Sequence, residues 1–310
     1  MAHNFEIRAS APGTLMMLGE HAVLHGARAL VLAVDKRIRV RLSPQSIRMV
    51  RIDSALGSYE SSLDLLLDDA RFRFVLSAIN QFKERVPTGF SLTIESDFSH
   101  QVGLGSSAAV TVAVLAVLNF WMEQQCDKQS LFEQSRRAML EVQGRGSGAD
   151  LAAAIEGGLV AYYQSGERQK FEDLPAVGLY YCGYKVKTPV VLQRVAEASE
   201  NLPSLYAELY RLMGRCAEQG CLAALGADWP QLGRLMNIYQ GLMDALGVND
   251  AKLSEIVYAL RQSDSVLGAK ISGSGLGDCV ISLGLPESPC AFEAIPVQVS
   301  PQGVEVDYAC

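Results

Sequence analysis

The chain has 310 residues, of which 49% are hydrophobic and 20% charged, and 34 acidic residues against 27 basic ones give a net charge of −7. At roughly 150 residues per domain, this length predicts about two domains, and the apolar fraction excludes an intrinsically disordered chain. The acidic balance argues against a broad nucleic-acid-binding surface, although a local pocket can still hold an anionic ligand.

The first half of the chain mixes strands and helices. Alternating apolar and polar residues, or short buried apolar runs, predict strands at 5–10, 29–34, 38–42, 90–95, 159–163 and 179–184. Apolar residues at helical spacing predict a helix at 64–85. Two more helices are predicted at 128–142, which is more polar, and at 149–155, which glycines bound on both sides.

One uncharged run raises the question of a membrane segment. Residues 101–122 carry no charge, and 108–122 are mostly apolar, close to the ~18 residues that a spanning helix needs. The run begins with Gly-Leu-Gly-Ser-Ser, which is typical of a loop, so its apolar part is too short. We therefore expect a buried helix and no membrane association. The N-terminal residues lack a secretory signal pattern, and we expect a cytoplasmic protein.

Composition changes near residue 185. Beyond it, long amphipathic segments predict helices at 192–200, 205–225, 229–246 and 253–264, followed by a glycine-rich loop and a strand at 279–283. Strands and helices do not alternate regularly, which favours an α+β fold over a doubly wound parallel sheet. We predict an N-terminal domain over 1–184 and a C-terminal domain over 185–310. The amphipathic helices allow a homodimer, and a monomer remains an alternative.

The most informative stretch is Gly103-Leu104-Gly105-Ser106-Ser107-Ala108. Its glycines let backbone N–H groups gather around an anion, and the following helix directs its positive end to the same place. The serines can add hydroxyl contacts to phosphate or Mg²⁺. Taken alone, the stretch fits a phosphate site and an ordinary glycine-rich turn with a serine cap equally well.

Two further Gly/Ser loops strengthen the phosphate hypothesis. They are residues 144–148, just before Asp150, and residues 272–277. Phosphoryl transfer also needs Mg²⁺ and a group that positions or deprotonates the acceptor. Glu20, Glu141 and Asp150 are the acidic candidates beside these loops. The residues alone indicate a nucleotide- or phosphate-binding enzyme.

These motifs resemble the GHMP kinase family, whose members include galactokinases, homoserine kinases, mevalonate kinases and phosphomevalonate kinases. The matches are Ala11-Pro12-Gly13 leading to Gly19-Glu20-His21, then 103–109, and then 270–277. Residues 19–26 look most like the mevalonate kinase branch. The resemblance implies a ribosomal-protein-S5-type N-terminal domain and a ferredoxin-like C-terminal domain. It further implies ATP- and Mg²⁺-dependent phosphorylation of mevalonate to 5-phosphomevalonate, for isoprenoid biosynthesis.

The resemblance also implies residue roles. Asp150 and Thr14 would be catalytic, with Asp150 taking the proton from the substrate hydroxyl or orienting it. The ATP phosphates would be bound by Gly103, Leu104, Gly105, Ser106, Ser107 and Ala108. Mg²⁺ would be held by Ser107 and Glu141. Substrate would contact Glu20, His21, His25, Gly273, Ser274 and Gly275.

Position 14 departs from the family pattern. The family usually has Lys there, whereas Thr14 supplies a hydroxyl without charge, so a cationic contribution to the transition state must come from elsewhere. Lys185 and Lys187 are candidates by residue type. Two alternatives stay open: a phosphomevalonate kinase, and a catalytically weak protein of the same fold that binds nucleotides or metabolites.

Overall fold

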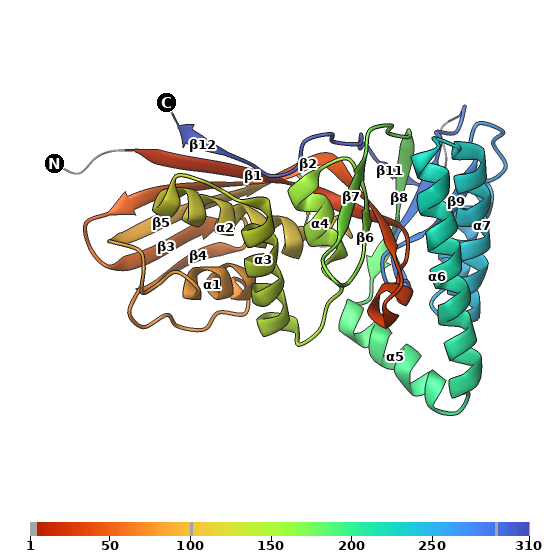
Figure 1. Cartoon of the computed structure of the whole chain (residues 1–310), viewed down its shortest axis with the longest axis horizontal. Helices are drawn as coiled ribbons and strands as arrows, with labels where there is room; N and C mark the ends of the chain where they lie inside the picture. Colours follow the sequence, from red (N-terminus) through yellow and green to blue (C-terminus); the bar gives the residue numbers. More distant parts are fainter. Residues whose placement is uncertain (1–4, 100–101, 289–290, 310) are drawn as a thin grey trace.

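The computed structural model describes residues 5–99, 102–288 and 291–309 and has two halves, each with its own sheet (Figure 1). Among these residues the first sheet has the strand order β12-β1-β2-β5-β3-β4, with β6 paired to β2 and β7 to β6. Its strands are β1 (Glu6–Leu18), β2 (Ala29–Gln45), β3 (Met49–Ser54), β4 (Gly57–Ser62), β5 (Gly89–Ser96), β6 (Leu159–Tyr162), β7 (Arg168–Phe171) and β12 (Glu305–Ala309).

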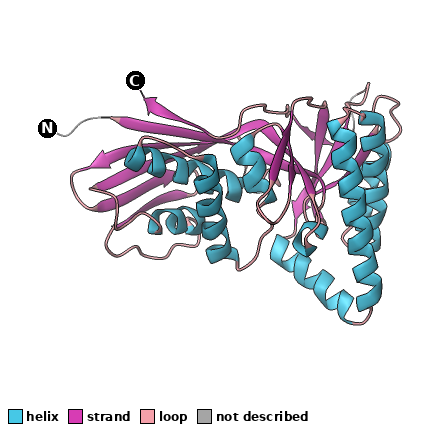
Figure 2. Cartoon of the chain, in the orientation of Figure 1, coloured by secondary structure: helices cyan, strands magenta, loops and turns pink. Residues whose placement is uncertain are grey.

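Four helices pack together against the first sheet, as the cyan elements of Figure 2 show. They are α1 (Arg73–Asn80), α2 (Ser106–Glu123), α3 (Lys128–Gln143) and α4 (Ala149–Glu156). The central helix, α2, contacts β1, β2 and the other three helices. By length and composition α2 could cross a membrane, but most of it is buried inside the fold. The predicted buried helix is confirmed.

The second half has a sheet with the order β11-β8-β10-β9 and a group of helices beside it. Its strands are β8 (Val177–Lys185), β9 (Gly268–Ser272), β10 (Gly277–Leu283) and β11 (Glu293–Ile295). Its helices are α5 (Thr188–Glu200), α6 (Pro203–Leu225), α7 (Trp229–Ala245) and α8 (Ala251–Leu260). The predicted α+β class is confirmed.

The second sheet begins earlier than the predicted domain boundary. Because β8 pairs with β10 and β11, residues 177–184 belong to the second sheet, although the sequence assigned them to 1–184. The chain then returns at its end, since β12 pairs with β1 in the first sheet. A single cut at residue 185 therefore separates neither sheet cleanly, because strand pairing joins segments far apart in sequence.

Some predicted elements differ in length. Strands 29–34 and 38–42 form one continuous strand, β2. The helix predicted over 64–85 shrinks to α1, since most of 64–72 is loop and turn. The hairpin of β3 and β4 was not predicted: its strands have short patterns of alternating burial with few apolar residues.

Two apolar clusters hold the fold together. The first lies between the first sheet and α1–α4. The second combines the helices and sheet of the second half with residues of β1 and β2, among them Leu15, Met17 and Leu32. The two halves therefore share a continuous apolar contact, which fixes the position of the loops between them.

Candidate active site

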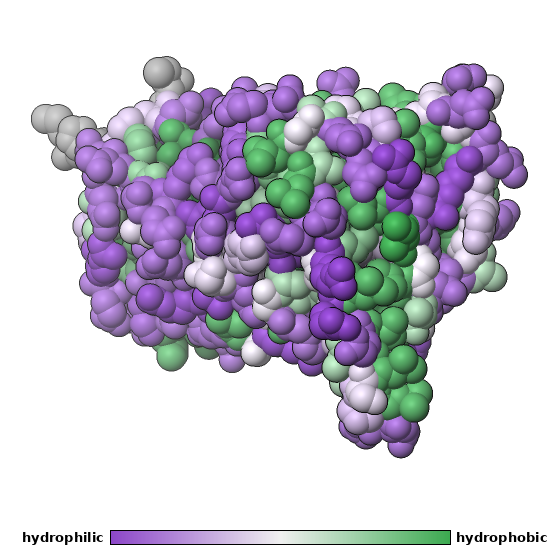
Figure 3. All heavy atoms as spheres, turned by 45° about the vertical axis from the view of Figure 1, so that its right-hand side comes forward, coloured by the Kyte–Doolittle hydropathy of each residue, from purple (hydrophilic) through white to green (hydrophobic). Residues whose placement is uncertain are grey.

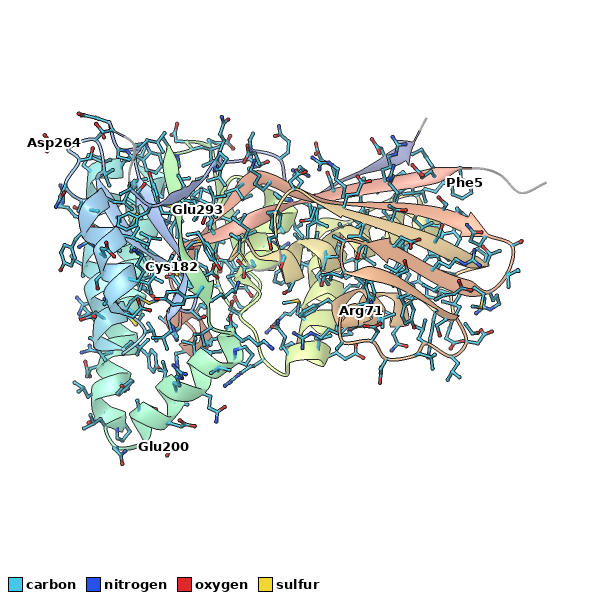
Figure 4. The ribbon with its side chains drawn as sticks, turned by 180° about the vertical axis from the view of Figure 1, so that it is seen from behind. Phe5, Arg71, Cys182, Glu200, Asp264 and Glu293 are labelled. Atoms are coloured by element: carbon cyan, nitrogen blue, oxygen red, sulfur yellow. The ribbon has the colours of Figure 1, made fainter. Side chains whose placement is uncertain are left out.

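A cavity of about 260 Å³ is lined by residues from both halves. Its walls come from β1, from the N-terminal ends of α2 and α4, from α3, and from the segments after β8 and β9. Figure 4 views the molecule from behind and labels Cys182 on β8, between the helices of the second half and the first sheet. The cavity brings together all three glycine-rich loops that the sequence singled out.

The first loop opens onto the cavity at the start of α2. Gly105, Ser106, Ser107 and Ala108 line the cavity together with Gly103. No side-chain hydrogen bond caps this helix end, and Gly105 adopts a left-handed conformation with φ of 62°. First-turn N–H groups are therefore available to an anion, and the helix dipole favours negative charge there.

Leu104 differs from its neighbours in this loop. Its side chain is buried in the second apolar cluster, and its carbonyl accepts a hydrogen bond from the backbone N–H of Thr14 at 3.0 Å. Leu104 thus fixes the loop to β1 and does not line the cavity.

The two predicted catalytic residues are in direct contact. The Thr14 hydroxyl donates a hydrogen bond to Oδ1 of Asp150 at 2.7 Å. The pair lies against residues 103–108, which we call the phosphate-type loop. A Cβ added to Gly105 of this loop would be 2.0 Å from Oγ1 of Thr14 and 3.6 Å from Cγ of Asp150. This glycine is needed for the close approach.

Burial raises the pKa of the Asp150 carboxyl above its ordinary value. The hydrogen bond from Thr14 and the positive charge of Lys185 oppose this rise, and the charge of Glu20 adds to it. A carboxylate with a raised pKa is a better proton acceptor than an ordinary aspartate. Asp150 therefore has the chemistry of a proton acceptor at the wall of the cavity.

Glu20 forms a buried ion pair with Lys270 on β9, with 2.5 Å between Oε1 and Nζ. Their side chains are 2% and 0% exposed. In the part of the chain that the structure describes, Oε2 of Glu20 is buried without a hydrogen-bond partner. Glu20 is also among the residues that line the cavity.

His21 is held by the third glycine-rich loop. Its Nε2 donates to the carbonyl of Ser274 at 2.9 Å, because a carbonyl can only accept. Burial lowers the pKa of the His21 imidazole, which keeps it neutral at neutral pH. Its Nδ1 is then the acceptor nitrogen.

Two predicted substrate contacts lie outside the cavity wall. His25 stacks on Tyr210 with ring centroids 3.8 Å apart, in an adjoining hollow that also contains His21. Gly275 packs against the loop after α7, since a Cβ added to it would lie 2.3 Å from the carbonyl oxygen of Val248. Gly273 and Ser274 of the same loop do line the cavity.

Glu141 is not brought to Ser107. Its carboxylate accepts a hydrogen bond from the Ser77 hydroxyl of α1 at 2.6 Å. The face of α3 that lines the cavity carries Arg136, Met139, Leu140 and Gln143, and the helical turn directs Glu141 elsewhere. Within residues 5–99, 102–288 and 291–309, no cluster of three or more His, Cys, Asp or Glu side chains could hold a metal ion.

Several charged residues of the cavity were missed or named only by type. Arg136 and Arg145 line it, and Lys185 forms an ion pair with Asp278 at 2.9 Å. The other oxygen of Asp278 accepts a hydrogen bond from the Gly103 N–H at 2.6 Å. The helical face of α3 could have indicated Arg136, whereas the contact between positions 103 and 278 has no local sequence signal.

The comparisons with known proteins agree with this geometry. The family models described as GHMP kinases N terminal domain and GHMP kinases C terminal match residues 73–158 and 221–289. A mevalonate kinase of Pyrococcus abyssi is 33% identical over 300 residues, covering 89% of this chain and 88% of that protein.

Solved structures of two family members share the fold. A mevalonate kinase of Methanococcus jannaschii has a TM-score of 0.78 at 21% identity, covering 94% of this chain and 98% of that one. A Lactococcus lactis galactokinase complexed with galactose also has a TM-score of 0.78, at 17% identity, covering 97% and 95%. The family models, the relative that aligns over most of both chains and the shared two-domain fold lead to one conclusion: this chain belongs to the GHMP kinase family.

Proposed function

We propose that this chain transfers the γ-phosphoryl group of ATP to the C5 hydroxyl of mevalonate. The observation that carries the proposal is the Thr14–Asp150 pair, which lies against Gly105 at the open N-terminus of α2. A proton acceptor and an anion-binding helix end therefore share one cavity. The choice of acceptor is supported by the similarity to the mevalonate kinase of Pyrococcus abyssi.

In the proposed reaction the substrate hydroxyl oxygen forms a bond to the γ-phosphorus of ATP. Asp150 accepts the hydroxyl proton, the bond from the γ-phosphorus to the bridging oxygen breaks, and ADP leaves with that electron pair. The first-turn N–H groups of α2 and the hydroxyls of Ser106 and Ser107 bind phosphate oxygens. Because catalysis of phosphoryl transfer is mainly positioning and charge stabilisation, these fixed donors suit it.

Mg²⁺ binding fits part of the predicted ligand set. Mg²⁺ in kinases is held by few protein oxygens together with substrate phosphates and water, and Ser107 offers such an oxygen in the cavity. Glu141 lies on another face of α3, bonded to Ser77, so we assign the metal contact to Ser107. When bound with ATP, Mg²⁺ neutralises charge on the phosphate oxygens.

The acceptor end of the cavity suits a hydroxylated carboxylate. Neutral His21 lines the cavity and offers an acceptor nitrogen to a substrate hydroxyl. Arg136 and Arg145 supply positive charge at the wall formed by α3 and the loop after it, where a substrate carboxylate would be stabilised.

An acceptor panel tests the proposal. Steady-state ADP formation is measured with ATP, Mg²⁺ and mevalonate, phosphomevalonate, galactose or homoserine as acceptor. We expect mevalonate to give the highest kcat/KM. Equal or faster turnover of phosphomevalonate would replace this function by phosphomevalonate kinase. ATP-induced thermal stabilisation without turnover of any acceptor would favour a metabolite-binding protein.

A homodimer remains a prediction for the second half. Apolar side chains gather along the arm formed by α5 and α6 (Figure 3), where Leu202, Leu205 and Leu212 are exposed. Light scattering coupled to size-exclusion chromatography would give the mass in solution. A mass of 33.5 kDa would identify the monomer, and twice that value the dimer.

A further inference from the structure

Lys185 brings an ammonium group to the wall of the cavity. It is the last residue of β8 and lines the cavity, with its side chain about one-third exposed. Its Nζ is 2.9 Å from Oδ2 of Asp278. Strand pairing sets this position, because Lys185 lies opposite Gly277, the residue before Asp278, in the register of β8 and β10.

Asp278 connects this lysine to the phosphate-type loop. Its second carboxylate oxygen accepts a hydrogen bond from the Gly103 N–H at 2.6 Å. The contact is close enough to require glycine, since a Cβ at position 103 would lie 2.0 Å from Oδ2 of Asp278. The carboxylate therefore holds Lys185 beside a loop that is built to receive phosphate.

The backbone of Asp278 supports a functional role. Its φ is +74°, a left-handed conformation that few non-glycine residues adopt. Strain of this kind persists where the surrounding structure enforces it, and it is concentrated at functional sites. Here the strained residue is the one that bridges Lys185 and Gly103.

The other cations of the cavity region are committed elsewhere or come from a different wall. Lys270 is fully buried against Glu20. Arg136 lies on α3, and Arg145, in the loop after it, donates to the carbonyl of Pro189 at 3.4 Å. Among the described residues, Lys185 is the cation whose charge acts on Asp150 and favours its ionised form. Thr14, the hydrogen-bond partner of Asp150, brings no charge.

We propose that Lys185 is a catalytic residue that contacts the transferring phosphoryl group, supplying the positive charge that Thr14 lacks, and that Asp278 is its positioning residue. The proposal rests on the phosphoryl transfer proposed above. An ammonium group has three N–H donors, so Lys185 can keep its bond to Asp278 and still donate to a phosphoryl oxygen. As charge spreads over these oxygens in the transition state, the fixed ammonium stabilises it.

The central experiment compares Lys185→Met, Lys185→Arg and Lys187→Met in steady-state assays. Lys187 is the matched control, since it is exposed, two residues away, and outside the cavity wall. We expect Lys185→Met to lower kcat by about 10²–10³, the usual effect of removing one transition-state donor, with a much smaller change in the KM for ATP. Lys185→Arg should recover part of kcat, because it restores the positive charge. The kcat of Lys187→Met should stay within about twofold of wild type, because this variant removes no donor from the cavity.

A second variant tests the positioning role. Asp278→Asn keeps an oxygen that can accept from the Gly103 N–H but removes the charge that holds Lys185. We expect kcat to fall, and we expect Asp278→Asn to add little in the Lys185→Met background, because coupled residues are not additive. Full additivity of the two losses would overturn the positioning role.

The outcomes separate this proposal from the function on which it rests. A wild-type enzyme that phosphorylates mevalonate, combined with a Lys185→Met variant within threefold of its kcat, overturns the role of Lys185 alone. An equal loss in Lys185→Met and Lys185→Arg, with both variants folded by circular dichroism, also contradicts it. A wild-type chain that phosphorylates none of the acceptors overturns the proposed function itself.

Discussion

The buried ion pair between Glu20 and Lys270 gives the sharpest stability prediction. It joins the turn after β1 to β9 and so connects the two halves of the fold. Lys270→Met keeps an unbranched chain of similar length and removes the charge. The Glu20 carboxylate then stays 2% exposed in the folded state without its cation.

The expected loss follows from this burial. Removing one partner of a buried ion pair costs about 3–5 kcal/mol, because the remaining charge is left in a medium that solvates it poorly. At about 1.4 kcal/mol per factor of ten, the ratio of folded to unfolded protein falls by roughly 10²- to 5,000-fold. Since domains are stable by only about 5–15 kcal/mol, Lys270→Met should be strongly destabilised.

The Glu20→Gln variant should have a definite pH dependence. In Glu20→Gln the unpaired group is Lys270. Burial already lowers the pKa of Lys270, and the Glu20 charge that opposes this lowering is lost. The unfolded state then binds more protons, and stability rises with pH towards ~10.

Urea denaturation at pH 5, 7 and 9 measures these effects. The two tryptophans, Trp121 on α2 and Trp229 on α7, report on both halves. The double variant Glu20→Gln/Lys270→Met should regain most of the lost free energy of unfolding, because neither charge remains buried. Lys252→Met is the control: its ion pair with Glu255 is exposed and should be worth about 0–1 kcal/mol.

Equal stability of Lys270→Met and Lys252→Met would refute the reasoning. So would stability of Glu20→Gln that does not rise between pH 5 and pH 9, because a purely steric effect of the substitution would not depend on pH.

Three further predictions concern the cavity. Asp150→Asn should lower kcat by about 10²–10⁴ while ATP binding, measured by calorimetry, is retained; unchanged kcat would show that Asp150 only stabilises the start of α4. Thr14→Val removes a hydrogen bond that lowers the pKa of Asp150, so the acidic limb of the kcat profile should move to higher pH; a shift to lower pH would contradict the contact. Gly103→Ala should displace Asp278 and cost about 1–3 kcal/mol in thermal unfolding analysis; wild-type stability would show that the loop adapts freely.

Local chemistry made much of the site predictable. Glycines and serines at 103–108 indicated an anion-binding helix start, and the structure has that helix begin at Ser106 on the cavity wall. The roles of Asp150 and Thr14 came from the family resemblance, and their mutual hydrogen bond is a finding of the structure. Motif residues were accessible to sequence reasoning because each motif carries its own backbone geometry.

Long-range contacts were not predictable in the same way. Asp278 meets Gly103 across 175 positions, and Lys185 reaches Asp278 only because β8 pairs with β10. Glu141 illustrates the opposite error, since it lies close in sequence to the cavity-lining face of α3 but bonds to Ser77 instead. A rotation of one residue along a helix changes which side chain faces a ligand.

The apolar character of α2 and its role at the cavity have a common physical basis. A helix with no charged residue before its last position, Glu123, can be buried among other elements, and burial lowers the dielectric around its backbone dipoles. The partial positive charge at its N-terminus is then screened less than at an exposed helix end. This helix start can hold phosphate through backbone N–H groups without the lysine that closes a P-loop. In the proposed mechanism the side-chain cation comes from the second half, so Lys185 lies beside Gly103 only when the two halves are assembled.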